Sequence, residues 1–190
     1  MAVEGDTFGE GTECVGERTP VTFIPVLREN QMEICESLAR EIWSEHYTSI
    51  IGREQVDYML ARFQSRDAIS NQIGEGVLYF LMEAGSQFIG YLAVQPRGRE
   101  LFLGKIYVRS SSRMRGFARK ALLFIEGLAR KRGMGKISLT VNRNNTGSIR
   151  AYEKLGFKNC GPVVKDIGGG FVMDDYRMEK LVSSPAQGAK

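Results

Sequence analysis

Cysteine and histidine are scarce in this sequence, and neither forms a metal or redox motif. The three cysteines, Cys14, Cys35 and Cys160, give an odd count with no CxxC pair and no metal-ligand spacing. The sole histidine, His46, lies far from any motif, so no Cys–His nucleophile is indicated. We therefore expect reduced thiols, no bound metal and a cytoplasmic location.

Long apolar runs and a strong net charge are also missing. No apolar run reaches the roughly 18 residues that a membrane-spanning helix needs, and the N-terminus lacks the pattern of a signal peptide. Lys and Arg number 26 against 22 Asp and Glu, a net charge of +4. This balance suits an anionic ligand but falls short of the dense basic surface of a nucleic-acid binder. We expect neither a membrane nor a nucleic acid as a partner.

The chain has the length and composition of one domain. Its 190 residues are 43% hydrophobic, which is enough for a single packed core. Residues 1–20 are polar and rich in glycine and glutamate, so we expect a disordered leader. Residues 21–181 are expected to form the domain, and 182–190 a flexible tail.

Hydrophobic periodicity predicts a mixed α/β fold. Three strand patterns in the middle of the chain are apolar on both faces, so helices must cover both sides of the sheet. The strand–helix–strand order at 100–142 predicts a right-handed crossover between parallel strands. We predict one sheet of six to seven strands. The predicted strands are 21–27, 77–84, 87–95, 101–108, 136–142, 158–166 and 171–181, and the predicted helices begin near Asn30 and cover 53–64, 66–73, 117–132 and 146–155.

The stretch RMRGFARK, residues 113–120, concentrates positive charge where a strand passes into a helix. A helix N-terminus presents unpaired N–H groups and a partial positive charge, and the small residues Gly116 and Ala118 let backbone amides approach an anion. The charge alone favours the alternative of an ordinary solvated turn with surface arginines. The stretch matches neither a P-loop nor a dinucleotide-binding glycine pattern.

Two motifs together identify a family resemblance. Arg113-x-x-Gly116-x-Ala118 resembles the pyrophosphate-binding signature of the GNAT superfamily of N-acetyltransferases, and NNTGSIRAYEKLGF at 144–157 is similar to a second segment of that family. The two stand in the family's order, separated by one helix and one strand. The resemblance covers roughly 21–181. It implies the GNAT fold, with a splayed, bulged strand pair, and acetyl-CoA (coenzyme A) as the cofactor.

The resemblance also assigns roles at the donor site. It implies that the backbone of Ile106, Tyr107 and Val108 pairs with the pantetheine arm. The pyrophosphate would be held by the loop, and Asn145 and Ser148 would contact the cofactor. Asn145 alternatively caps the helix that follows it. The implied loop residues are Arg113, Met114, Arg115, Gly116, Phe117, Ala118 and Arg119. Gly104 fits either a bulge or a close approach to a helix.

Tyr152 is the catalytic candidate that the resemblance implies. A phenol with a pKa near 10 can protonate a leaving thiolate whose parent thiol has a pKa near 8.5; the alternative is a core tyrosine. Many family members carry a glutamate on the pyrophosphate strand as the base, and here Gly104 and Lys105 stand in that region. Other candidates are Glu45, His46, Glu100, Asp174 and Asp175. A water chain to backbone carbonyls is equally open.

The acceptor pocket of this family lies between the helices after the first strand and the late strands. Trp43, His46 and Tyr47 are predicted to line it from one side and Asp174 from the other, with Tyr58, Met173 and Tyr176 as further candidates. An aromatic wall with a carboxylate suits a cationic amine; the alternative is that these residues pack the helices.

The resemblance implies an N-acetyltransferase that transfers the acetyl group by direct attack in a ternary complex. The C-terminal segment resembles polyamine-type acetyltransferases more loosely, which makes a small amine plausible without excluding a peptide amine or an antibiotic. The alternative is a catalytically idle relative that senses acetyl-CoA or binds a partner. A homodimer is left open.

Overall fold

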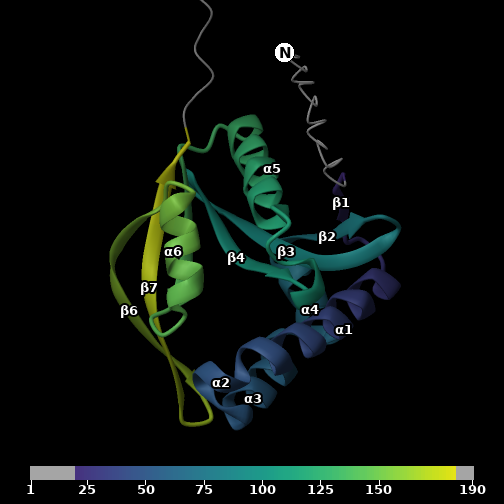
Figure 1. Cartoon of the computed structure of the whole chain (residues 1–190), viewed down its shortest axis with the longest axis vertical. Helices are drawn as coiled ribbons and strands as arrows, with labels where there is room; N and C mark the ends of the chain where they lie inside the picture. The colour runs from purple at the N-terminus through teal and green to yellow at the C-terminus, as the bar shows by residue number, and fades with distance from the viewer. Residues whose placement is uncertain (1–19, 183–190) are drawn as a thin grey trace, which may run out of the picture.

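The computed structural model describes residues 20–182 and places seven strands in one mixed sheet (Figure 1). The strand order across this sheet is β1-β2-β3-β4-β5-β7-β6. The pair β4 and β5 is parallel and the other pairs are antiparallel, as the crossover rule predicted. The strands are β1 Thr22–Pro25, β2 Leu78–Ala84, β3 Gln87–Arg97, β4 Glu100–Val108, β5 Lys136–Asn142, β6 Lys158–Gly168 and β7 Phe171–Leu181.

The helices begin and end within a few residues of the ranges that the hydrophobic periodicity predicts. They are α1 Glu29–His46, α2 Thr48–Ile51, α3 Arg53–Phe63, α4 Arg66–Gly74, α5 Phe117–Lys131 and α6 Thr146–Lys154, with a 3-10 turn at Ser110–Ser112. The single turn α2 was not predicted, because four residues are too few to display a helical period. The predicted mixed α/β fold is confirmed.

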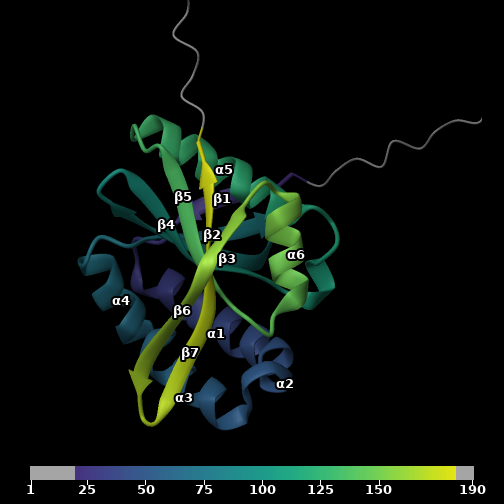
Figure 2. The ribbon, with the colours of Figure 1, turned by 90° about the vertical axis from the view of Figure 1, so that its left-hand side faces the viewer.

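Two apolar cores lie on opposite faces of the sheet (Figures 1 and 2). Neighbouring residues of β3 alternate between them: Tyr91 packs with α1, α3 and α4, and Leu92 packs with α5. Both side chains are fully buried. This two-sided burial explains why the central strands are apolar at successive positions rather than alternating with polar residues.

The parallel strands β4 and β5 separate halfway along their length. They pair only from Glu100–Leu103 with Lys136–Leu139. Against β3, Ala93 faces Lys105 and Val94 faces Leu103, so Gly104 is the extra residue of a β-bulge. A Cβ on Gly104 would lie 3.5 Å from Phe102, an ordinary contact, so the bulge and not a close helix approach accounts for this glycine. Beyond the bulge, the β5-facing edge of β4 is open.

Gly90 of β3 is required by the close approach of β3 and β4 beside this opening. A Cβ built there would lie 2.1 Å from the backbone oxygen of Tyr107, which is too short for any real contact. We expect Gly90→Ala to lower the free energy of unfolding by about 3 kcal/mol or more, since backbone would have to move. Gly127→Ala on α5, where no atom lies within 4 Å, is the matched control. We expect it to be neutral or stabilising by about 0.5–1 kcal/mol. Urea denaturation measures both, and equal stabilities would contradict the argument.

The last described residue is part of the packed domain and not of the flexible tail that we predicted. Val182, placed in the tail by the sequence, is buried, and its N–H donates to the Gly135 carbonyl at 2.9 Å. The rest of the predicted leader and tail, 1–19 and 183–190, lies outside the described residues. None of the helices between 20 and 182 has both the length and the apolar character needed to cross a membrane.

Candidate active site

The loop between β4 and α5 presents backbone N–H groups at the start of a helix. Gly116 is the N-cap of α5 and has φ 79°, a left-handed conformation that favours glycine. No side chain caps this helix start. Met114, two residues earlier, also has a positive φ of 61°. The amides of the first turn of α5 are therefore available to an anion, as the motif predicts.

The basic side chains of the loop are partly engaged with the protein itself. Arg113 Nε donates to the Val108 carbonyl at 3.0 Å. A backbone carbonyl oxygen has two lone pairs, so this contact leaves one of them for a second donor. The guanidinium of Arg115 and the ammonium of Lys120 lie 5.4 and 5.5 Å from the Phe117 ring. The loop is thus anchored to the core through Phe117, which is buried.

A cavity of about 620 Å³ runs from this loop along the open edge of β4 to α6. Ten of the twelve residues predicted to bind the cofactor line it, and Arg115 and Arg119 do not. The ten are Ile106, Tyr107, Val108, Arg113, Met114, Gly116, Phe117, Ala118, Asn145 and Ser148. Its donors are backbone amides at one end and an open strand edge at the other, and this set fits a pyrophosphate joined to an extended amide-containing arm. We call this space the donor cavity.

His46 lies in the donor cavity and not on the acceptor side, where it was predicted. It is the last residue of α1, and its ring Nε2 lies 3.5 Å from Asn145 Nδ2. Burial and the nearby Arg113 lower the pKa of His46. The apolar face of α1 points into the core along most of its length, but at its last turn the same face borders this cavity.

Asn145 caps α6 and also lies in the wall of the donor cavity, so its position is compatible with both roles that the sequence left open. Its Oδ1 accepts from the Ser148 N–H at 3.2 Å and so caps α6. The side chain is buried and lines the donor cavity. The cap fixes the start of the helix that carries Ser148 and Tyr152.

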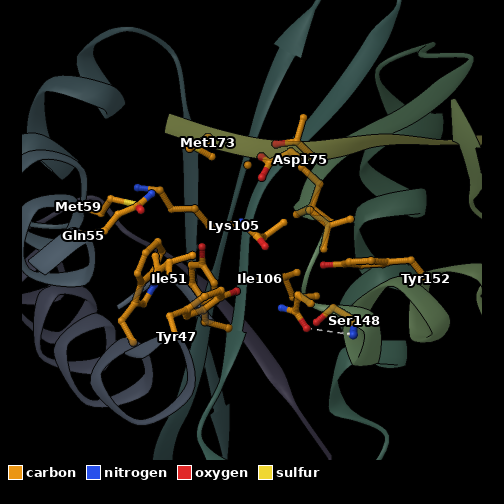
Figure 3. A pocket seen from close by; sticks show the side chains of 18 residues that line it. Tyr47, Ile51, Gln55, Met59, Lys105, Ile106, Ser148, Tyr152, Met173 and Asp175 are labelled. Atoms are coloured by element: carbon orange, nitrogen blue, oxygen red, sulfur yellow. Dashed lines mark hydrogen bonds between the residues drawn. The ribbon is translucent and has the colours of Figure 1, made fainter. Parts of the chain in front are cut away.

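A second, smaller cavity of about 120 Å³ lies among α2, α3, β4, β5, β7 and α6 (Figure 3). We call it the acceptor cavity. Six residues border both spaces, so the two cavities meet where these side chains lie. They are Tyr47, Ile106, Tyr107, Asn145, Ser148 and Tyr152. The remaining lining residues are Trp43, Ile51, Gln55, Met59, Leu103, Gly104, Lys105, Thr140, Val141, Asn142, Met173 and Asp175.

Tyr152 projects from α6 into this meeting point (Figure 3). Its ring packs edge-on against Phe157, with the centroids 5.6 Å apart. Burial raises the pKa of Tyr152 well above its usual value, and the nearby Tyr47 acts in the same direction. The phenol is therefore protonated at physiological pH.

The aromatic wall that we predicted is made by Trp43 and Tyr47, together with Tyr107. The ring centroid of Trp43 lies 4.6 Å from that of Tyr47 and 5.5 Å from that of Tyr107. Burial raises the pKa of Tyr47 to about 12. Tyr58 does not line the cavity. Its hydroxyl donates to the Ile167 carbonyl at 2.7 Å, and its ring packs under the turn between β6 and β7.

Asp175, and not Asp174, is the carboxylate of the acceptor cavity. The prediction for Asp174 is wrong because successive side chains of a strand point to opposite faces. Asp174 points away and forms an ion pair with Arg143 at 2.8 Å. Tyr176 shares the face of Asp174, packs against the core on the α5 side of the sheet, and has the Arg143 guanidinium 5.7 Å from its ring centre. Phe171 and Met173 are apolar and pack against the core formed with α1, α3 and α4. Because alternate residues of a strand share a face, this pattern would have placed Asp175 on the same face as these two residues.

The other candidates for the base lie elsewhere. Glu100 stands at the opposite end of β4, where Arg177 and Lys136 bind it at 2.9 and 3.3 Å. Glu45 is exposed. Burial raises the pKa of Asp175 above its usual value, partly opposed by a hydrogen bond from Thr140. Among the five candidates named from the sequence, Asp175 alone borders the acceptor cavity.

Comparison with known proteins agrees with this geometry. The model of the acetyltransferase (GNAT) family matches residues 36–157. Spermidine N(1)-acetyltransferase of Thermoplasma acidophilum is 26% identical over 166 residues, covering 83% of this chain and 98% of that protein. N-acetyltransferase 8F1 of Mus musculus is 25% identical over 130 residues, covering 65% of this chain and 54% of that protein.

Solved structures share the fold. The PaiA N-acetyltransferase from Thermoplasma acidophilum, crystallised in complex with coenzyme A, has a TM-score of 0.71 at 24% identity, covering 85% of this chain and 99% of that one. The ribosomal-protein-S18-alanine N-acetyltransferase from Escherichia coli has a TM-score of 0.65 at 18% identity, covering 90% of this chain and 99% of that one.

Proposed function

Since the chain belongs to the acetyltransferase (GNAT) family, we propose that it acetylates a small primary amine by direct attack in a ternary complex. Family membership makes it an N-acetyltransferase and makes acetyl-CoA its acetyl donor. The observation that carries the proposal is the meeting of two cavities at Tyr152, with Asp175 on the acceptor side. Donor and acceptor can therefore occupy the protein at the same time.

The donor cavity suits acetyl-CoA through backbone groups more than through side-chain charge. The amides around Gly116 would hold the pyrophosphate, and the open edge of β4 at Ile106 and Tyr107 would pair with the pantetheine arm. Acetyl-CoA supplies the acetyl group as a thioester. Asn145 and Ser148 border both cavities and would orient the end of the arm.

Two side chains of this protein would move the protons of the reaction. Asp175 would accept the proton that the amine nitrogen loses as it forms the amide bond, and its carboxylate would first attract the amine. Tyr152 would donate a proton to the departing sulfur. An acceptor that arrives as an ammonium ion first loses one proton through Asp175 to solvent, which frees the nitrogen lone pair for attack. As the amide bond forms, the nitrogen loses a second proton and the sulfur gains one from Tyr152, so the overall reaction releases one proton. The carboxylate that the strand lacks at Gly104 is thus provided from β7, which argues against the catalytically idle alternative.

The size and walls of the acceptor cavity favour a small molecule. The cavity measures about 120 Å³, and aromatic and apolar side chains line it together with uncharged polar groups, one lysine and one carboxylate. The relative from Thermoplasma acidophilum is a spermidine acetyltransferase, which supports an amine of low molecular weight. The test is release of coenzyme A thiol on mixing acetyl-CoA with primary amines, with the acetylated amine identified by mass. Acetyl-CoA binding without acetylation of any amine would refute the proposal.

Asp175→Asn should lower kcat/KM for the amine by about 10²–10⁴-fold, the usual contribution of a general base. In the wild type, protonation of Asp175 removes both its negative charge and its ability to accept a proton. Activity should therefore fall as pH decreases through the raised pKa of this carboxyl. The variant should lose that acidic limb of the pH profile.

Asp174→Asn is the matched control, because this neighbouring carboxylate points to the opposite face of β7. We expect it to keep the wild-type rate and pH profile. Both variants should keep the rise in melting temperature that saturating acetyl-CoA produces. If Asp175→Asn and Asp174→Asn have the same kcat/KM for the amine, Asp175 is not the group that accepts its proton.

A further inference from the structure

Lys105 is a buried lysine beside the bulge of β4, and no step of the proposed reaction uses it. Its side chain reaches from the central strand toward α3, away from Tyr152 (Figure 3). Nζ donates to the Phe63 carbonyl and to Gln72 Oε1, each at 2.9 Å, and to the Tyr79 hydroxyl. Three acceptors for three N–H bonds are the complement of an ammonium group.

The positive charge of Lys105 is held by dipoles and not by a carboxylate. Phe63 is the last residue of α3, so its carbonyl belongs to the helix end that favours a cation. The ionisable group that acts on Lys105 is the thiol of Cys35, and burial raises the pKa of that thiol to about 12, which keeps it neutral. Burial lowers the pKa of Lys105 to about 7. No anion among these partners offsets its charge.

Lys105 and Asp175 are the two charged side chains among the described residues that line the acceptor cavity. Their formal charges cancel, and the remaining lining side chains are neutral. Asp175 can attract one amine group of an acceptor. A second ammonium group on the same acceptor would find no carboxylate of its own on these walls and would be repelled by Lys105.

We propose that Lys105 makes the acceptor cavity select monoamines with an apolar body over diamines and polyamines. This inference rests on the proposed function and narrows its substrate class. It gives this chain a substrate preference different from the one named for its spermidine-acetylating relative. The walls formed by Trp43, Ile51, Met59 and Met173 would contact the apolar body of the acceptor.

The wild-type protein tests the proposal with acceptors of matched length. n-Butylamine, 1,4-diaminobutane and spermidine would be compared as acceptors at about pH 6, below the pKa of Lys105, with the acetylated products quantified by mass spectrometry. We expect kcat/KM for the monoamine to exceed that for the diamine by about tenfold or more, from repulsion of like charges in a partly desolvated site. A preference for the diamine or for spermidine would overturn the inference and leave the proposed function standing. Failure to acetylate any amine despite acetyl-CoA binding would overturn both.

Lys105→Met and Lys105→Arg separate charge from packing. After the methionine substitution, Gln72 Nε2 still donates to the Phe63 carbonyl at 3.1 Å and the Tyr79 hydroxyl to Gln72 Oε1 at 2.7 Å, so the neighbouring groups keep partners. We expect the ratio of monoamine to diamine kcat/KM to fall by about tenfold in Lys105→Met and to persist in Lys105→Arg. An unchanged ratio in a folded, acetyl-CoA-binding Lys105→Met would contradict the proposal. If Lys105→Met does not fold, the wild-type comparison decides alone.

Discussion

Replacing Tyr152 by phenylalanine should lower kcat by about 10²–10⁴-fold, because the variant has no phenolic proton to give to the departing sulfur. Burial raises the pKa of Tyr152, so the wild-type phenol keeps its proton throughout the neutral pH range. A change of pH within that range should therefore not reproduce the effect of the substitution. The affinity for acetyl-CoA should change little, since the ring remains to line the donor cavity. Stopped-flow or steady-state thiol release measures kcat, and titration calorimetry measures the affinity.

Phenylalanine keeps the edge-on packing of this ring against Phe157, so the variant should fold and melt as the wild type does. Tyr176→Phe is the matched control. This half-buried tyrosine lies beside Arg143 on the face of β7 that carries Asp174, packs against the core there, and borders neither cavity. Its removal should leave kcat unchanged. If Tyr152→Phe also retains the wild-type kcat, Tyr152 is a packing residue and a different group protonates the thiolate.

The donor side of the site was predictable because its information is local. The loop depends on a positive φ at Gly116 and on a helix that starts immediately after it, and both features lie within a few residues of one motif. The cap that Asn145 places on α6 spans three residues. The bulge at Gly104 is similar, since a glycine inside an apolar strand indicates an irregular position.

The acceptor side was predicted less well because it depends on packing between distant segments. Asp175 shares a face of β7 with Phe171 and Met173, but only the packing of that face against α1 and α3 shows that it borders the acceptor cavity. His46 follows the apolar period of α1, yet the position of that helix over the sheet brings its last turn to the donor cavity. Lys105 reaches carbonyl and amide groups 42 and 33 residues away along the chain, and no short pattern indicates those contacts.

Gly116→Glu should weaken acetyl-CoA binding by about 10²-fold or more. The substitution places a carboxylate at the helix start where the pyrophosphate would bind, and like charges repel strongly at such short range. It also forces a side chain onto a backbone with φ 79°, which L-residues other than asparagine and aspartate rarely adopt. Acetyl-CoA at a concentration that saturates the wild type should raise the melting temperature of the variant much less than that of the wild type.

Two controls separate the charge from the backbone strain. Gly116→Asn introduces a residue that tolerates the left-handed conformation and carries no charge. Its affinity for acetyl-CoA should therefore stay within about threefold of the wild-type affinity. Gly98→Glu adds the same carboxylate at φ 57° in the turn between β3 and β4, where no atom lies within 4 Å of the new Cβ. Because Gly98 borders neither cavity, this variant should bind acetyl-CoA normally. Retained affinity in Gly116→Glu, or an equal loss in Gly98→Glu, would show that the amides at the start of α5 do not hold the pyrophosphate.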